Sequence, residues 1–237
     1  MTAQQGSGRQ AVLTLLSSNS TRGVLAQLLP EFERTTGTRV TVSYDPALIM
    51  LKRIRAGETG DVAILGEAAI DALAAERRII PESRRTLARC RVGIAVGAGA
   101  PKPDVSSVEA FKHALLAAES VCHTTSGASG IHFSRVIEQL GIADAIKPKA
   151  VKNEGGLIGE LVASGEAELA IQQIPELMAV SGIELVGPLP EALQSVSVTT
   201  AAIFSASGRA AEAQALIDFL STPASLGVLR AKGFEPA

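Results

Sequence analysis

Aromatic residues are scarce in this chain of 237 residues, which has no Trp, one Tyr and six Phe. Hydrophobic residues nevertheless make up 46% of the sequence, so the core must be built mainly from aliphatic side chains. Few aromatic rings are available for stacking on exposed bases. A formal net charge of -2 also provides no basic surface for a phosphate backbone. These two shortages argue against nucleic acid as a partner.

Cysteine and histidine are also few, at two and three residues. Cys90 and Cys122 match no metal-binding spacing, and two buried, reduced thiols are favoured over a disulfide. His113, His123 and His132 lack a spacing such as HExxH. The sequence therefore predicts neither a metal site nor a cofactor.

Long apolar runs are missing as well. No run reaches about 18 uninterrupted apolar residues, so we expect no membrane insertion. Residues 1–10 are polar and lack the apolar stretch of a secretory signal peptide. We expect a periplasmic protein if a signal peptide has been removed, and a cytoplasmic one if the sequence begins at its native start.

Short apolar runs alternate with helical patterns along the chain. The predicted strands are residues 11–16, 39–44, 61–65, 91–96, 120–123, 150–152, 169–173, 183–186 and 195–204. The predicted helices are residues 22–36, 47–56, 68–77, 107–118, 131–140, 157–164, 175–180, 210–220 and 224–232. This alternation favours an α/β fold with mostly parallel sheets. Pro30 should kink or interrupt the first helix, and Gly37 should end it.

Two extended patterns, residues 86–96 and 194–204, are longer than an ordinary strand. Two such segments suit two crossings between lobes. We predict a discontinuous first lobe of residues 1–90 plus 197–237, and a second lobe of residues 91–196. Ligands of open α/β sheets bind beyond the carboxyl ends of the strands, so the ligand is expected in a cleft between the lobes.

Small polar residues fill the first strand-to-helix junction, residues 17–21, and include Ser17, Ser18 and Asn19. The first turn of a helix carries unpaired N–H groups and a partial positive charge, so such a junction can hold an anion. The same residues are good helix N-caps, and a single junction more often has that plainer role.

A second junction, residues 124–130, has four hydroxyl residues and two glycines ahead of a helix. Ser126, Ser129 and Gly130 are its candidate ligand-binding residues, and Gly156 ends a third junction. Neither a phosphate-binding GxxxxGK[ST] loop nor a GxGxxG fingerprint is present. A flexible N-cap explains one such loop equally well, but two polar junctions in different predicted lobes favour a ligand in the cleft.

Two further junctions carry polar side chains. Gln172 and Gln173 end an otherwise apolar strand, and their amides can donate to a ligand and accept from it. The alternative is that one of them faces solvent, so at most one is expected to reach the ligand. Ser43, Tyr44 and Asp45 end the second strand.

Asp45 has three possible roles: half of an acid–base pair with Tyr44, a filter against anions, or a cap before Pro46 and its helix. His132 lies early in a helix and has a position from which it could face the cleft. A lone His there more often packs or lies at the surface. No Ser–His–Asp triad and no paired carboxylates can be assigned from the order of residues.

The sequence resembles the molybdate-type periplasmic binding proteins, type 2 solute-binding proteins of ABC importers. The resemblance runs from about residue 11 to residue 233, through SSNST, VTVSYD, AGETGDVAIL, SGASGIHFSRVIEQLGI and GEAELAIQQIPEL followed by GIELVGPLP. It implies two α/β lobes joined by two crossing strands, which close on an oxyanion by hinge motion. It also implies the membrane subunit of an ABC importer as a partner. We expect a monomer.

The resemblance places a ligand-binding serine at Ser17 or Ser18 and a backbone donor at Ser129. Two positions depart from the family pattern. Asp45 stands near the place of a serine that helps to grip molybdate, and the glutamine pair replaces a tyrosine. A charged Asp45 would repel a tetrahedral dianion, and amides suit a carboxylate. These departures favour an organic carboxylate over molybdate.

The leading hypothesis is therefore an ABC-type substrate-binding protein that holds a small organic anion in its cleft. The alternative is an isomerase of a di- or tricarboxylic acid, since the sequence resembles a subgroup that also resembles aconitate isomerase. Such an enzyme needs a base near an acidified C–H group and donors for an enolate-like charge. Asp45, Tyr44 or His132 would be that base. A ligand-sensing regulatory module is a third option, although no DNA-binding segment is recognisable.

Overall fold

The computed structural model describes residues 11–237, and residues 1–10, with the expectation about a signal peptide, lie outside this range. The strands are β1 Val12–Ser18, β2 Arg39–Asp45, β3 Val62–Gly66, β4 Arg85–Gly97, β5 Val121–Thr124, β6 Ala150–Asn153, β7 Leu169–Gln173, β8 Ile183–Pro188, β9 Val196–Ile203 and β10 Glu235–Pro236. The α-helices are α1 Arg22–Thr36, α2 Ala47–Arg55, α3 Glu67–Ala75, α4 Val108–Ala117, α5 Ala128–Gln139, α6 Ala143–Ile146, α7 Gly159–Ala163, α8 Ile174–Leu177, α9 Ala210–Leu220 and α10 Pro223–Ala231. Short 3-10 turns are η1 Asn19–Thr21, η2 Pro81–Ser83, η3 Lys147–Lys149 and η4 Glu191–Leu193. Each predicted strand and helix has a counterpart, while α6 and β10 had not been predicted.

The strands form one hydrogen-bonded sheet in the order β2-β1-β3-β9-β4-β7-β5-β6, and β8 and β10 also pair with β4. β1 is parallel to β2 and β3, and β5 is parallel to β6 and β7. The pairs made by β4 and β9 are antiparallel. Two parallel groups of strands are thus joined through antiparallel pairing of the two long strands.

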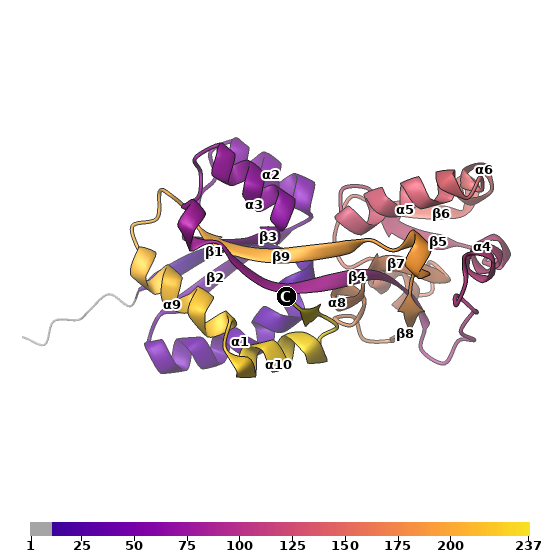
Figure 1. The fold of residues 1–237 in the computed structure, drawn as a ribbon. Helices are drawn as coiled ribbons and strands as arrows, with labels where there is room; N and C mark the ends of the chain where they lie inside the picture. Colours follow the sequence, from indigo (N-terminus) through magenta and orange to yellow (C-terminus); the bar gives the residue numbers. More distant parts are fainter. Residues whose placement is uncertain (1–10) are drawn as a thin grey trace, which may run out of the picture.

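β4 has 13 residues and changes partners along its length. Residues 85–91 pair with β9, whereas residues 92–97 pair with β7 and β8. Figure 1 shows β4 and β9 side by side, running from one group of strands toward the other. The assignment of residues 1–90 plus 197–237 and of residues 91–196 to two lobes stays a prediction, and this change of partners is the feature that supports it.

The hydrophobic clusters do not mix residues from the two groups. In the first group, Leu13 and Leu15 of β1 pack toward α1, α9 and α10, while Leu16 packs toward α2 and α3. Helices therefore cover both faces of this part of the sheet (Figure 1). In the second group, Phe111 of α4 and Phe133 of α5 join one cluster, and α7 and α8 contribute to another. Aliphatic side chains dominate all four clusters, as the scarcity of aromatic residues predicted.

The first helix ends as predicted but is not interrupted. α1 continues through Pro30, so of the two predicted outcomes the interruption is wrong, and the kink stays a prediction. Leu25 and Leu28 before the proline and Phe32 after it are buried in one cluster, and this packing holds the helix together. Gly37 ends the helix in the left-handed conformation, with φ 71, and its N–H donates to Glu33 O at 2.9 Å.

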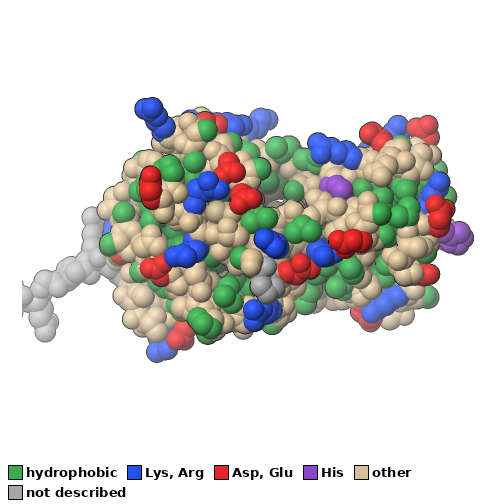
Figure 2. All heavy atoms as spheres, in the orientation of Figure 1, with side chains coloured by type: hydrophobic (Ala, Val, Ile, Leu, Met, Phe, Trp, Pro, Cys, Tyr) green, Lys and Arg blue, Asp and Glu red, His purple; other side chains and the backbone are tan. Residues whose placement is uncertain are grey.

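Cys90 and Cys122 are both free and buried, which confirms the expectation of reduced thiols. On the face that Figure 2 shows, acidic and basic side chains are interspersed rather than gathered by sign. No helix within residues 11–237 is long and apolar enough to cross a membrane.

Candidate functional site

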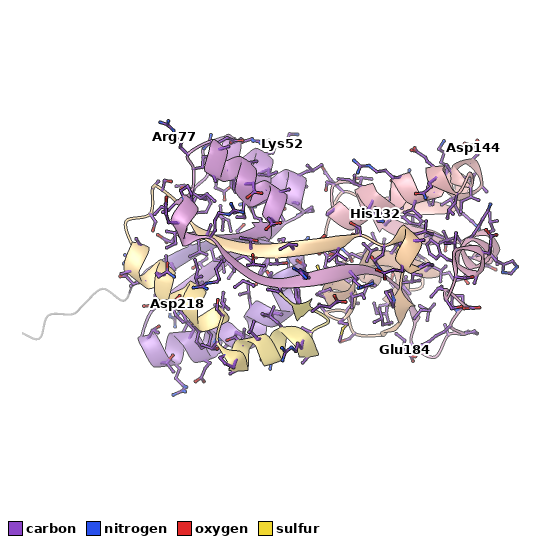
Figure 3. All side chains as sticks on the ribbon, viewed as in Figure 1. Lys52, Arg77, His132, Asp144, Glu184 and Asp218 are labelled. Atoms are coloured by element: carbon purple, nitrogen blue, oxygen red, sulfur yellow. The ribbon has the colours of Figure 1, made fainter. Side chains whose placement is uncertain are left out.

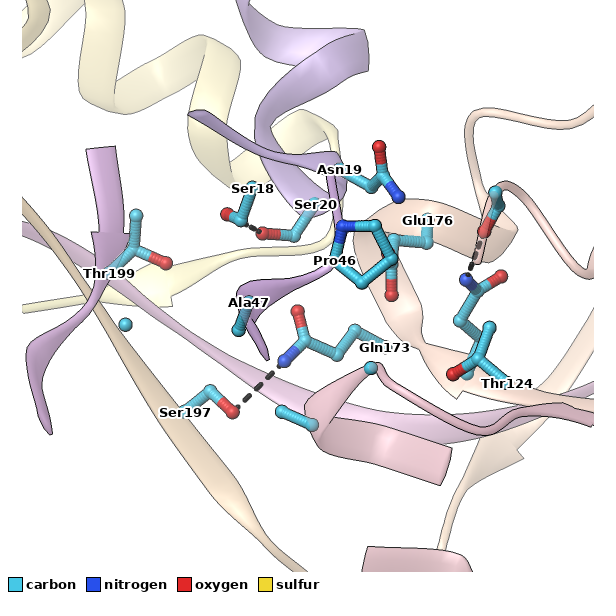
Figure 4. Close-up of a pocket in the computed structure, with 15 residues that line it drawn as sticks. Ser18, Asn19, Ser20, Pro46, Ala47, Thr124, Gln173, Glu176, Ser197 and Thr199 are labelled. Atoms are coloured by element: carbon cyan, nitrogen blue, oxygen red, sulfur yellow. Dashed lines mark hydrogen bonds between the residues drawn. The ribbon is translucent and has the colours of Figure 1, made fainter. Parts of the chain in front are cut away.

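A cavity of about 60 Å³ lies where strands of both groups end and helices begin (Figure 4). Its lining residues are Ser18, Asn19, Ser20, Pro46, Ala47, Gly66, Thr124, Gly127, Ala128, Gly156, Gln172, Gln173, Glu176, Ser197 and Thr199. Residues from β1 to α3 and from β9 line one part, and residues from β5 to α8 line the other. The cavity therefore lies between the two groups of strands.

Helices α2, α3 and α5 begin at this cavity without a side chain to cap them, as does the four-residue α8 after Gln173. The N-cap residues of α2, α3 and α5 are Pro46, Gly66 and Gly127; all three line the cavity and none makes a side-chain cap hydrogen bond. Of the helices that begin elsewhere, α4 and α10 are capped by the hydroxyls of Ser107 and Thr222, whereas α1, α6, α7 and α9 have no side-chain cap either. The bare first turns keep N–H donors and the positive ends of the helix dipoles for a ligand. This electrostatic environment favours an anion.

The junction after β1 divides its polar side chains between the cavity and the protein interior. Ser18, Asn19 and Ser20 line the cavity, and the hydroxyls of Ser18 and Ser20 lie 3.0 Å apart. The Ser17 hydroxyl lies 2.6 Å from that of Thr21 and donates to a β3 carbonyl at 3.2 Å. Successive side chains of a strand point to opposite faces, so Ser17 and Ser18 separate in this way.

Gln172 fastens the loop that follows β6. Its Oε1 accepts from the Ile158 backbone N–H at 2.9 Å, and its Nε2 donates to the Gly156 carbonyl at 2.9 Å. These two bonds use one lone pair of Oε1 and one N–H of Nε2, so the amide retains one lone pair and one N–H for other partners. Gln172 therefore shapes the cavity by holding Gly156 in its wall.

Gln173 links β7 to both long strands. Its Nε2 donates to Ser197 Oγ of β9 at 3.0 Å (Figure 4), and its Oε1 accepts from the Cys90 thiol of β4 at 3.4 Å. Burial raises the pKa of Cys90 well above its usual range, so the thiol keeps its proton and can donate. These two bonds fix the direction of the Gln173 amide at the cavity wall.

Glu176 is the only ionisable residue among the fifteen that line the cavity. It lies in α8 and is 8% exposed. Burial raises the pKa of its carboxyl to about 8, against the opposing effect of the Gln173 backbone N–H. At neutral pH the side chain is therefore mostly a neutral carboxylic acid, which can donate a hydrogen bond.

The second polar junction meets the cavity at Thr124 and Gly127. The Thr124 hydroxyl is buried and has no hydrogen-bond partner within residues 11–237. Ser126 donates its hydroxyl to a carbonyl of the loop before α7, and Ser129 is buried inside α5, so neither lines the cavity. At Gly130, a Cβ would lie 1.8 Å from the Thr124 carbonyl oxygen, so the chain can approach this closely only with glycine.

The three predicted residues at the end of β2, Ser43, Tyr44 and Asp45, do not line the cavity. Arg53 of α2 bonds both Ser43 Oγ, at 2.9 Å, and the Asp45 carboxylate. The Arg22 guanidinium carbon lies 4.4 Å from the centroid of the Tyr44 ring. Burial raises the pKa of the Tyr44 hydroxyl. Asp45 and Tyr44 therefore have structural partners, and only the residues after them, Pro46 and Ala47, reach the cavity.

His132 is held by another segment of the second group. It projects from α5 (Figure 3), and its Nε2 donates to the Leu193 carbonyl at 2.8 Å. It does not line the cavity. Across residues 11–237, no three His, Cys, Asp or Glu side chains gather so as to hold a metal ion.

The two groups of strands touch beside the cavity. Gly155 in the loop before α7 faces Pro46 in front of α2, so that a Cβ on Gly155 would lie 2.4 Å from Pro46 Cγ. Both neighbouring positions, Gly156 and Ala47, line the cavity. This contact narrows the rim of the cavity.

The structure thus brings Ser18, Asn19, Gly156, Gln172 and Gln173 together at the cavity. A ligand-binding role for each of the predicted residues stays a prediction. Sequence reasoning missed Glu176, Ser197 and Thr199, and it included Ser20 and Thr124 only as members of the two polar junctions. For Glu176 the one available signal was an acidic residue three positions beyond a polar strand end, followed by an apolar residue.

A model of the family described as bacterial extracellular solute-binding proteins matches residues 13–235, and the chain belongs to this family. It is 32% identical over 230 residues to an aconitate isomerase of a Pseudomonas species, covering 94% of this chain and 87% of the relative. It is 28% identical over 229 residues to the molybdate-binding protein ModA of Azotobacter vinelandii, covering 89% of this chain and 84% of that protein.

Among solved structures, the periplasmic molybdate-binding protein of Azotobacter vinelandii has the same fold, with a TM-score of 0.80 at 19% identity. The match covers 95% of this chain and 99% of that one. These similarities confirm the resemblance to molybdate-type binding proteins and to aconitate isomerase, and they confirm the α/β fold of type 2 periplasmic binding proteins.

Replacement of Gly130 tests the close approach of α5 to β5. We expect Gly130→Ala to destabilise the protein by about 2 kcal/mol or more, because the new methyl group would collide with the Thr124 backbone. Gly208→Ala is the matched control, since a Cβ there has no neighbour within 4 Å. Urea denaturation measures both variants, and equal stability of the two would contradict the close approach.

In the protein without ligand, Glu176→Gln tests whether burial raises the pKa of this carboxyl. The folded chain keeps the proton up to about pH 8, whereas an unfolded chain loses it near the ordinary value of 4.5. Folding therefore takes up a proton in this window, and the free energy of unfolding falls with rising pH by about 1.4 kcal/mol per unit. Glutamine is neutral in both states, so we expect the variant to be more stable than the wild type at pH 7.5, by up to about 4 kcal/mol.

Urea denaturation at pH 5 and pH 7.5 measures this difference. Glu160→Gln, at an exposed position of α7, removes the same charge and is expected to follow the wild type. An equal pH dependence of wild type and Glu176→Gln would show that Glu176 titrates normally.

Proposed function

We propose that this protein binds a small organic anion, a di- or tricarboxylate, in the cavity between its two groups of strands. The observation that carries the proposal is the meeting of three uncapped helix N-termini, at Pro46, Gly66 and Gly127, around one cavity. These termini supply positive potential and N–H donors although no Lys, Arg or His is among the lining residues.

The lining also contains donors that have no other obvious use. The buried Thr124 hydroxyl lacks a partner within the described residues, and buried polar groups are nearly always bonded. Each glutamine amide retains an N–H after its protein contacts, and Asn19 adds a further amide. An anion in the cavity would satisfy these groups.

A carboxylate suits the lining better than a tetrahedral oxyanion. Pro46, Ala47 and Ala128 give the wall apolar patches between the donors. The carbon skeleton of an organic acid can pack against such patches, whereas molybdate presents only oxygen atoms. The relatives include both an aconitate isomerase and a molybdate-binding protein, and the glutamine pair favours the ligand chemistry of the first.

A thermal-shift screen tests this proposal. We expect citrate, cis-aconitate or trans-aconitate to raise the melting temperature at millimolar concentration, because a ligand that binds only the folded state stabilises it. Molybdate, tungstate and sulfate form the comparison. Stabilisation by micromolar molybdate, with the organic acids inert, would overturn the preference for a carboxylate.

Thr124→Val locates the binding site. Loss of a hydrogen bond to a charged group costs about 1.5–3 kcal/mol, so we expect the Kd of the best organic acid to rise at least about tenfold. Thr200→Val is the matched control: its hydroxyl is also buried and without a partner in residues 11–237, but it does not line the cavity. Calorimetric titration of both variants measures the difference, and equal affinities would place the anion elsewhere.

A second candidate function, isomerisation of the bound acid, is favoured by Glu176. A group with a pKa of about 8 in the wall of this cavity can exchange a proton near neutral pH. In its deprotonated form, Glu176 would take a proton from a methylene carbon beside a C=C bond. The C–H electron pair would become the new double bond, and the far carbon of the old one would receive the proton. Asp45, Tyr44 and His132 lie outside the lining, so Glu176 replaces them as the proposed base.

An NMR time course with cis-aconitate in D2O tests the isomerase. We expect trans-aconitate and deuterium at the exchanged carbon, at a rate that rises with pH toward pH 8. Glu176→Gln should lower this rate by about 100-fold or more. Absence of both conversion and exchange, with cis-aconitate bound, would leave binding alone as the function.

In the binding role, the membrane subunit of an ABC importer is the partner that we propose. The family consists of extracellular solute-binding proteins, so an exported chain would work in the periplasm. We propose residues 1–90 plus 197–237 and residues 91–196 as the two lobes that close on the ligand.

A further inference from the structure

Glu176 is a buried acid that faces the cavity without a counter-charge. It has no ion-pair partner within residues 11–237, although eleven ion pairs occur there. It is the third residue of α8, a helix that begins immediately after Gln173, the last residue of β7. Figure 4 shows its side chain among the cavity residues, on the side of Asn19 and Pro46.

The elements around α8 supply no cation to stabilise a charged carboxylate. α8 packs against β4, β7, β8, η1 and α1. β7 and η1 contain no titratable residue. The neighbour from β4 is the Cys90 thiol, and its pKa is raised first by burial and then by the charge on Glu176.

The remaining charges on these elements have other partners or face solvent. On β4, Arg91 pairs with two glutamates, and Arg85 and Arg89 are exposed. On β8, Glu184 pairs with Lys102. On α1, Arg22 lies over Tyr44, Glu31 pairs with Arg34, and Glu33 accepts from the Val40 backbone; Lys232, after α10, lies near Gly23.

We propose that Glu176 binds the anion in its protonated form and donates a hydrogen bond to it, so that anion binding above pH 8 takes up one proton. This inference rests on the proposed binding function and not on the isomerase, which needs deprotonated Glu176 as its base. It adds a residue that determines which charge state of the protein binds. It goes beyond the predicted site, in which Glu176 had no part.

The physical reason is that charged Glu176 would repel the anion, whereas protonated Glu176 can donate a strong hydrogen bond to it. A carboxylate and a bound anion a few ångströms apart in a site without cations repel each other strongly. A protonated carboxyl instead forms an O–H···O⁻ bond, which is about twice as strong as a bond between neutral groups. Burial already holds the proton on Glu176 near neutral pH, so the free protein is prepared for the anion at little cost.

Calorimetric titration with cis-aconitate and citrate tests the inference between pH 6.5 and pH 9.5. Two buffers of different ionisation enthalpy at each pH give the number of protons taken up per bound anion. Carboxyl groups of small acids titrate far below pH 8, so protons taken up above that pH come from the protein. Cys90 does not interfere, since its pKa is raised well above this range.

For the wild type we expect a constant Kd up to about pH 7, and a Kd that rises by about tenfold per pH unit above pH 8. Proton uptake should approach one per anion near pH 9. Glu176→Gln keeps a neutral N–H donor but loses the stronger O–H···O⁻ bond, so its Kd at pH 7 should be higher than that of the wild type. Its Kd should nevertheless remain flat up to pH 9.5, and its binding should involve no proton uptake. Glu160→Gln, the exposed control, should follow the wild type.

A second variant guards against misfolding of the first. Glu176→Asp retains a titratable carboxyl, and we expect it to retain proton uptake even if it binds more weakly. Wild-type binding without proton uptake between pH 8 and pH 9.5, or a Glu176→Gln profile identical to that of the wild type, overturns this inference alone. Failure of both acids to bind the wild type at every pH overturns the proposed function instead, and the inference with it.

Discussion

The antiparallel pairing of β4, first with β9 and then with β7 and β8, is the constraint on which the cavity depends. Because both groups of strands pair with β4, they belong to one sheet. The parallel strands of each group then end toward the same region, because their helices start there. β9, the other long strand, adds Ser197 and Thr199 to the wall of that region.

The cavity holds positive potential without a full positive charge. Partial charges at helix ends are fixed to the backbone, so they need no long side chain to be ordered and no buried cation to be stripped of water. The hydroxyl and amide groups add direction. The Glu176 carboxyl is the one acid among them. Burial raises its pKa, so the surrounding protein determines whether this side chain carries a charge.

The fold could be predicted from the sequence because each element has its own local pattern. Apolar runs and helix periodicity found β1 to β9, and Gly37 marked the end of α1 through its backbone conformation. The same local reasoning failed at Pro30, where packing on both sides of the proline holds one helix together.

The site was only partly predictable, because membership in it depends on contacts between distant segments. Ser18 and Asn19 follow from the end of β1. In contrast, Asp45 at the end of β2 forms an ion pair with Arg53 in the following helix, α2. No sequence spacing rule identifies such a pair. Ser197 reaches the cavity only through the pairing of β9, and the burial of Glu176 comes from the packing of α8 on β4.

The contact between Gly155 and Pro46 gives glycine a role beyond backbone flexibility. The two residues are 109 positions apart in sequence, from 46 to 155, and lie on opposite rims of the cavity. Any side chain at residue 155 would act as a wedge, because its first carbon already overlaps the proline ring. A methyl group at residue 155 would therefore push the loop before α7 away from Pro46 and widen the rim of the cavity.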